Sequence, residues 1–217
     1  MTDENFDCSV FINCPFDSEY SPLLEALCFC ICYFGLTPRL ASERLEAGEN
    51  RLDKIVGIIS GSRYSVHDLS RCRARESNEF FRMNMPFELG LDFGFRRSQG
   101  GAYGKKKFLV FEEKQYDLKQ ALSDLAGTDI AFHERTYEKI IQHARNFFRV
   151  EAGIKAPGVK RIIGDYVTFQ TWLMEKKISE GHSEEEARQL PVSERLEEIR
   201  IWMASGSPAE FDPEPEA

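Results

Sequence analysis

The chain has 217 residues, 42% of them hydrophobic and 29% charged, a composition typical of a folded globular protein and not of a disordered one. No run of 18 apolar residues occurs, which argues against a membrane-spanning helix, and the acidic first residues do not resemble a secretory signal. The formal net charge of −8 argues against generic nucleic-acid binding, although it leaves room for a local basic patch.

Short β-rich runs alternate with longer helical patterns over the first 155 residues, as in parallel α/β proteins. Five strands are predicted, at 9–14, 36–41, 63–69, 107–111 and 129–133. Five helices are predicted, at 20–34, 50–59, 84–94, 118–125 and 137–148, and the charged stretch 71–82 is predicted to be a loop. Because crossovers between parallel strands are right-handed, this order predicts a five-stranded, flavodoxin-like parallel sheet with flanking helices.

The segment 84–94 has conflicting patterns. Its apolar residues alternate, which is typical of a strand. Two glycines, Gly90 and Gly94, would weaken a central strand, and Pro86 near the start of the segment suits the first turn of a helix. We therefore predict a helix, with both glycines on one stripe that lets it pack closely against the sheet.

Glu88 lies near the start of this predicted helix, at the carboxyl edge of the sheet, where open α/β sheets bind ligands. The positive end of the helix dipole is expected to favour the ionised carboxylate. From spacing alone, Glu88 is either a functional carboxylate or an acid that stabilises the first turn of its helix.

After residue 155 the sequence pattern is helical and shows no further strand signal. We predict an α/β domain over 8–155 and a helical extension over 157–204, which contains Trp172 and Trp202 at apolar positions. These helices either form a packing or oligomerisation surface or complete the core. The last segment, 205–217, has three prolines and four acidic residues and is predicted to be a disordered tail.

Six cysteines are present, and three of them crowd into one apolar stretch as Cys28, Cys30 and Cys32. Metal sites need spaced pairs of ligands, and no such pairs occur here, so we expect no metal. Disulfides are rare in cytoplasmic proteins. We therefore expect reduced, buried thiols and a cytoplasmic location.

Two motifs together resemble a known group of domains. Val-Phe-Ile-Asn-Cys-Pro-Phe-Asp spans 10–17, and Pro-Phe-Glu-Leu-Gly spans 86–90 after a loop rich in Arg, Ser and Asp. They resemble the Toll/interleukin-1 receptor (TIR)-like and nucleoside 2-deoxyribosyltransferase-like group, over residues 8–150. In that group a glutamate on the helix after the third strand attacks or stabilises the anomeric ribose carbon, and Glu88 matches it. The Trp-Cys pair that often precedes the TIR glutamate is replaced here by Asn84-Met85.

The resemblance implies an NAD glycohydrolase or a related N-ribosyl-cleaving enzyme. It would be an effector of bacterial antiviral defence, activated by assembly with further copies or with a partner protein. NAD would be the substrate, and no separate cofactor is implied. The alternative is a non-catalytic TIR-like module that senses a nucleotide or binds a protein. A third possibility is 2-deoxyribosyl transfer between bases.

Cleavage of a neutral nucleoside would need a proton donor beside Glu88, because the leaving base must be protonated. Asp68 and His67, at the end of the third predicted strand, are the candidates. Their alternative roles are a strand-end cap for Asp68 and a half-buried histidine for His67.

The loop after the first strand borders the same edge. The resemblance implies that it contacts ribose or base: Phe16 would stack on a ring, and Asn13 or Asp17 would accept a ribose hydroxyl. Asp17 is equally suited to capping the next helix.

Three arginines are candidates for binding phosphate. Guanidinium groups suit phosphate geometry, and the candidates are Arg39, Arg44 and Arg63.

Overall fold

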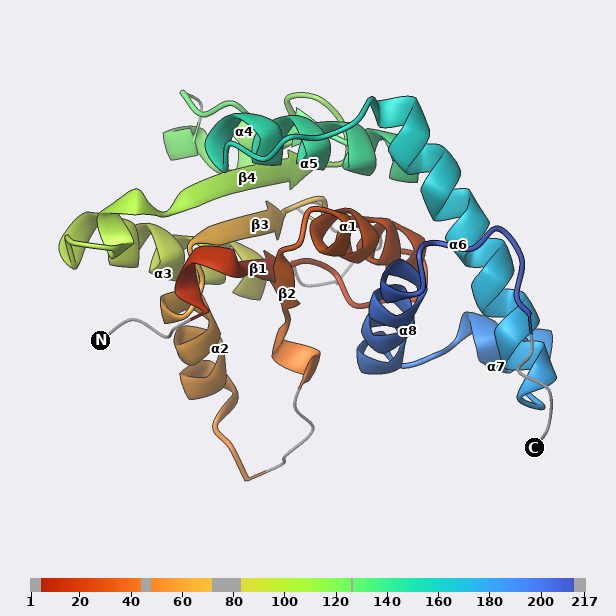
Figure 1. Cartoon of the computed structure of the whole chain (residues 1–217). Helices are drawn as coiled ribbons and strands as arrows, with labels where there is room; N and C mark the ends of the chain where they lie inside the picture. Colours follow the sequence, from red (N-terminus) through yellow and green to blue (C-terminus); the bar gives the residue numbers. More distant parts are fainter. Residues whose placement is uncertain (1–4, 44–47, 72–82, 126, 213–217) are drawn as a thin grey trace, which may run out of the picture.

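The computed structural model describes residues 5–43, 48–71, 83–125 and 127–212. Five strands form one parallel sheet in the order β2-β1-β3-β4-β5 (Figure 1). The strands are β1 (Ser9–Asn13), β2 (Thr37–Arg39), β3 (Tyr64–Asp68), β4 (Lys107–Glu112) and β5 (Ala131–Phe132). The predicted flavodoxin-like sheet is confirmed. The predicted loop 71–82 lies outside the described residues except for Arg71.

Helices cover both faces of the sheet. They are α1 (Ser21–Tyr33), α2 (Arg51–Ser60), α3 (Asn84–Ser98), α4 (Asp117–Ala121), α5 (Tyr137–Glu151), α6 (Val159–Ser179), α7 (Glu184–Arg188) and α8 (Val192–Ala204). α2 and α3 share apolar clusters with one face, whereas α1, α5, α6 and α8 share the large cluster on the other (Figure 1). No helix in the described part of the chain is both long and apolar enough to cross a membrane.

The segment 84–94 is helical, as predicted, but its glycines do not face the sheet. A Cβ atom added to Gly90 or Gly94 would meet nothing within 4 Å, and both residues are exposed. Together with Phe87 and Phe95 they line a shallow outer groove of about 370 Å³. The prediction of close glycine packing is therefore wrong, and other contacts hold α3 against the sheet.

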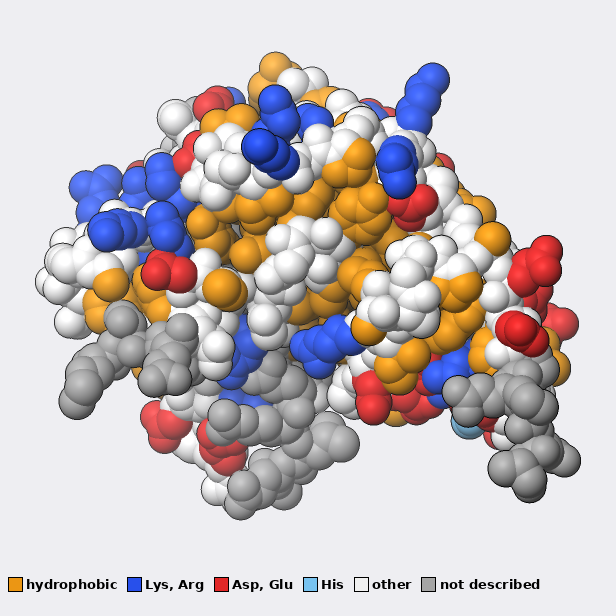
Figure 2. Space-filling view, viewed as in Figure 1, with side chains coloured by type: hydrophobic (Ala, Val, Ile, Leu, Met, Phe, Trp, Pro, Cys, Tyr) orange, Lys and Arg blue, Asp and Glu red, His pale blue; other side chains and the backbone are white. Residues whose placement is uncertain are grey.

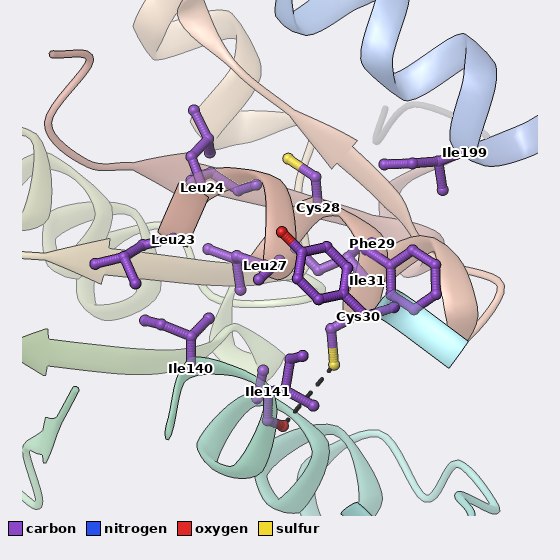
Figure 3. Packing of buried hydrophobic residues seen from close by; sticks show 14 of the residues in the cluster. Leu23, Leu24, Leu27, Cys28, Phe29, Cys30, Ile31, Ile140, Ile141 and Ile199 are labelled. Atoms are coloured by element: carbon purple, nitrogen blue, oxygen red, sulfur yellow. Dashed lines mark hydrogen bonds between the residues drawn. The ribbon is translucent and has the colours of Figure 1, made fainter. Parts of the chain in front are cut away.

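Helix α1 is apolar on nearly every side because it is enclosed on every side, and its one buried charge belongs to Glu25. All nine residues from Leu23 to Ile31 are buried (Figure 3). A helix that is hydrophobic all round belongs inside a protein, and α1 lies between the sheet and the C-terminal helices. Cys28 and Cys30 are free, buried thiols here, and Cys30 Sγ lies 4.0 Å from the Ile141 carbonyl (Figure 3).

The C-terminal helices complete the core over α1. Trp202 on α8 packs against Phe29 of α1 and Phe169 of α6, with ring centroids 5.7 Å away in both cases. Arg195 on α8 also forms a buried ion pair with Glu25 on α1. The extension predicted over 157–204 thus shares one hydrophobic core with the α/β sheet.

The segment after α8 was predicted to be disordered, but its described residues make contacts. Trp202 Nε1 donates to the Pro208 carbonyl at 2.9 Å. The Phe211 ring meets the Trp172 ring edge to face at 6.0 Å. The chain therefore runs back over α6 as far as Asp212, and residues 213–217 lie outside the described part.

We predict that Trp202→Ala destabilises the whole protein. Trp202 is 1% exposed, and removing a buried Trp side chain costs about 3–5 kcal/mol in the free energy of unfolding. Its neighbour Ile201 is 41% exposed, so Ile201→Ala, the matched control, should cost less than about 1 kcal/mol. Urea unfolding of both variants tests this. Similar costs for both would contradict a core shared with α8.

Candidate functional site

Polar side chains gather at the carboxyl ends of β1 and β3. Parallel pairing sets Asn13 beside His67 in register. Because side chains alternate along a strand, Asn13 and His67 point toward α2 and α3, whereas Asp68 points toward α1 and α5. The candidates therefore separate into two clusters, one on each face of the sheet edge.

The first cluster begins at Asn13. Its Nδ2 atom donates to the Met85 carbonyl at 2.8 Å and lies 3.1 Å from His67 Nδ1. Because a carbonyl only accepts, the Met85 contact fixes the orientation of the amide, which also donates to Nδ1. The proton of the neutral His67 ring then lies on Nε2, which is 3.2 Å from Asp92 Oδ2 on α3.

Asp92 is the centre of this cluster, which we call the Asp92 network (Asn13, Ser65, His67, Asp92 and Lys106). Ser65 Oγ donates to Asp92 Oδ2 at 2.5 Å, and Lys106 Nζ lies 3.0 Å from Oδ1. Burial raises the pKa of Asp92, but His67, Lys106 and Ser65 outweigh it and hold that pKa below its usual value. Burial lowers the pKa of Lys106, and the Asp92 charge opposes this.

Lys106 extends the network to α2. Its ammonium donates to the Ile59 carbonyl at 2.8 Å and also to the Ser62 carbonyl. These carbonyls lie at the C-terminal end of α2, where a cation is stabilising. One fully buried side chain thus joins α2, β4 and α3.

Glu88 lies one turn before Asp92 on the buried side of α3. It is 6% exposed, and no hydrogen bond or ion pair joins its carboxylate to any residue in the described part of the chain. Burial raises the pKa of Glu88 to about 7, although the Arg51 charge opposes the shift. The expectation that the helix dipole keeps this group ionised is therefore wrong, because desolvation is the larger effect and Glu88 is the fifth residue of α3, beyond its first turn.

Cys14 follows Asn13 at the carboxyl end of β1. It is buried directly after β1, and burial raises the pKa of its thiol well above the usual value. The charges of Asp68 and Glu88 raise that pKa further. Cys14 is thus a neutral wall residue, not a thiolate nucleophile.

The second cluster holds Asp68, the predicted proton donor. Asp68 Oδ2 accepts from Tyr20 Oη at 2.6 Å and lies 3.2 Å from His133 Nε2, while Oδ1 accepts from the Ser70 amide at 2.9 Å. Burial raises the pKa of Asp68, but His133, Ser70 and Tyr20 outweigh it, so the pKa is lowered. Asp68 is therefore ionised, and both of its carboxylate oxygens have partners.

Tyr20 and His133 were missing from the sequence prediction. A signal for His133 was available, because it is the last residue of the last predicted strand and so lies at the same sheet edge as Asp68. The Arg135 amide donates to His133 Nδ1 at 2.9 Å, which leaves the Nε2 proton facing Asp68.

The loop after β1 borders the edge, as predicted. Phe16 is 45% exposed, and its ring is accessible for stacking. Asp17 Oδ1 accepts from the Tyr20 amide at 3.1 Å and from Arg71 Nη2 at 2.8 Å. Asp17 thus closes the turn that leads into α1, which was its alternative role.

The three arginines occupy different places. Arg39 ends β2, in register with Phe11. Arg63 precedes β3 at the opposite, amino edge of the sheet and pairs with Asp7 at 2.8 Å, so it does not join Glu88. Arg44 lies outside the described residues.

A local basic patch does exist, as the sequence allowed. Arg96, Arg97 and Lys105 are exposed near the end of α3 and the start of β4, where Lys and Arg side chains gather in Figure 2. The patch therefore lies at the amino edge, away from Glu88.

We predict that Glu88→Gln stabilises the protein increasingly as the pH rises. Between the usual glutamate pKa and about 7, the folded parent binds more protons than the unfolded chain, so its stability falls with rising pH. Gln removes this loss, so the stability of the variant relative to the parent should increase between pH 5 and pH 8. Each kcal/mol gained in the free energy of unfolding should raise its Tm by about 2–4 °C.

Glu180→Gln is the control, because its stability relative to the parent should change with pH in the opposite direction. Burial raises the pKa of Glu180, but Lys177 and Lys176 outweigh it and lower the pKa, so this variant should lose stability relative to the parent as the pH rises. A Tm difference for Glu88→Gln that is the same at pH 5 and pH 8 would contradict a desolvated Glu88.

Comparison of the chain with models of protein families, with curated proteins and with solved structures finds no match.

Proposed function

We propose that this protein is an NAD glycohydrolase or a closely related enzyme that cleaves an N-ribosyl bond, with Glu88 as its catalytic carboxylate. The observation that carries the proposal is a carboxylate at the carboxyl edge that is 6% exposed and has no partner within the described residues. A buried carboxylate costs free energy unless it is paired, and such groups concentrate at functional sites. A cationic ligand would supply the missing partner.

The chemistry needs one carboxylate. When the bond between ribose C1′ and the nicotinamide nitrogen breaks, its electron pair moves to the ring and neutralises the pyridinium. The sugar becomes oxocarbenium-like, and an ionised Glu88 stabilises it or attacks C1′. Water then adds at C1′ and loses a proton, which gives free nicotinamide and the ribosyl product.

The state of the two candidate proton donors favours this substrate. His67 has both ring nitrogens occupied by Asn13 and Asp92, and Asp68 is ionised between Tyr20 and His133. A neutral nucleoside would need one of them to protonate its base. A pyridinium needs no proton, so the geometry favours NAD over 2-deoxyribosyl transfer.

Other parts of the proposal come from position and from the resemblance. Phe16 is the exposed ring at this edge and would stack on the nicotinamide or adenine. From the resemblance to TIR-like domains we take a cytoplasmic effector of bacterial antiviral defence, whose activity depends on assembly with further copies or a partner protein. The proposed ligand is a small nucleotide.

We predict release of nicotinamide when concentrated protein is incubated with NAD, measured by chromatography beside nucleosides as alternative substrates. Glu88→Gln should lower kcat by about 10²-fold or more, since one preorganised electrostatic group contributes roughly 3–4 kcal/mol to barrier lowering. Glu197→Gln, an exposed carboxylate on α8, is the matched control and should keep parental activity.

Two results would refute this assignment. No base release by the parent, even when assembled, would favour the non-catalytic interaction module. Full activity of Glu88→Gln would remove Glu88 from the mechanism.

The pH dependence of the parent gives a separate prediction. Only ionised Glu88 stabilises the oxocarbenium, so kcat/KM should rise with pH and level off above a midpoint of about 7. The charge of Arg51 on α2 acts on this carboxylate, and the neighbouring Cys14 thiol stays neutral over the same range. A kcat/KM that is flat from pH 5.5 to 8.5 would contradict the role of Glu88 ionisation.

A further inference from the structure

Helix α3 is attached to the sheet on both sides of Glu88. Three residues before it, the Met85 carbonyl accepts from Asn13 at the end of β1. Four residues after it, Asp92 binds Ser65, His67 and Lys106. Helix α3 is thus attached about one turn before and about one turn after Glu88.

The network fixes the helix without satisfying Glu88. No member of the Asp92 network hydrogen-bonds or ion-pairs with the Glu88 carboxylate, among all contacts of the described residues. The five side chains of the network are themselves fully buried and use one another and backbone carbonyls as partners. The polar side chains of the network are thus already paired, and within the described residues none of them pairs with the Glu88 carboxylate.

Stability alone does not explain such a network. Burying charges costs several kcal/mol for each ion, and apolar side chains of similar volume are often as stabilising or more so. A polar network does fix one geometry, because each group needs its partner at a defined distance and angle. On this face of the sheet, the network lies beside two apolar clusters and reaches from the helix turns that flank Glu88 to the end of α2.

We propose that Asn13, His67 and Asp92 are positioning residues for Glu88: they hold α3 at the turns before and after it, so that its carboxylate stays buried at the sheet edge with no partner among the described residues. Ser65 and Lys106 complete the attachment. The value of this arrangement for ribosyl cleavage rests on the proposed function, whereas the arrangement itself does not. Asn13 and His67, predicted from the sequence to contact the ligand, are thereby assigned to holding the helix.

A purely structural network would change stability and leave the surroundings of Glu88 unaltered in the folded protein. The readout that separates the two roles is the titration of Glu88 itself. It can be followed by ¹³C NMR in protein labelled at the glutamate side-chain carboxyl carbons, with the Glu88 resonance identified by its loss in Glu88→Gln. The parent should titrate with a midpoint of about 7.

Asn13→Ala releases the Met85 turn and should admit water to Glu88, lowering the midpoint by about one unit or more. Asp92→Asn alone would leave the Lys106 ammonium buried without a countercharge, so Asp92→Asn is combined with Lys106→Met and should have the same effect. Tyr20→Phe is the matched control, since it removes a buried hydrogen bond of 2.6 Å from the second cluster, and should leave the midpoint unchanged.

The proposal is overturned if the folded Asn13→Ala variant and the folded double variant both titrate like the parent, or if the parent midpoint is that of an ordinary glutamate. This test involves no turnover, so it is independent of the proposed function. A parent that releases no base from NAD, together with shifted midpoints in the variants, refutes the enzyme and supports the positioning role. In an active enzyme, Asn13→Ala should lower kcat with little change in KM.

Discussion

The ion pair between Asp92 and Lys106 is the contact on which the site depends. Two opposite charges lie 3.0 Å apart with neither side chain exposed, so their desolvation is offset only if every remaining polar atom has a partner. Ser65, His67 and two carbonyls at the end of α2 supply those partners. The Asp92–Lys106 pair and its partners thereby fix α2, α3, β3 and β4 relative to one another. Glu88 lies one turn from Asp92 on α3, so its position is fixed as well.

The two faces of the sheet contribute differently. On the α1 face, the large apolar cluster is extended by α6 and α8, and it contains most of the buried hydrophobic side chains. On the α3 face, the apolar clusters are smaller and polar groups take much of the interior. Hydrophobic burial scales with area, so the enlarged α1 face stabilises a fold whose other face contains desolvated charges. The C-terminal helices thus support the site through the core that they extend.

The sequence predicted the parallel sheet, its helices and the placement of Glu88, because alternation of elements and strand-end positions are local patterns. It did not predict the partnership of Asp92 with Lys106, which lie on different elements and have no shared spacing. Nor did it predict that desolvation outweighs the helix dipole at Glu88, since burial depends on the packing of several elements. A second missed signal was present: the largely apolar sequence of α1, with Glu25 as its one charged residue, indicates a helix covered on both sides, here by the sheet and α8.

Glu88 is a buried carboxylate with no partner among the described residues, and we propose that it binds a cationic ligand. Binding of NAD and NADH, compared by calorimetry at pH 8 before significant turnover, tests it most directly, because the two ligands differ mainly in the positive charge of the nicotinamide ring. The account predicts that NAD binds at least about tenfold more tightly, a difference of about 1.4 kcal/mol, and that Glu88→Gln abolishes the preference. Equal affinity of the parent for NAD and NADH would contradict it.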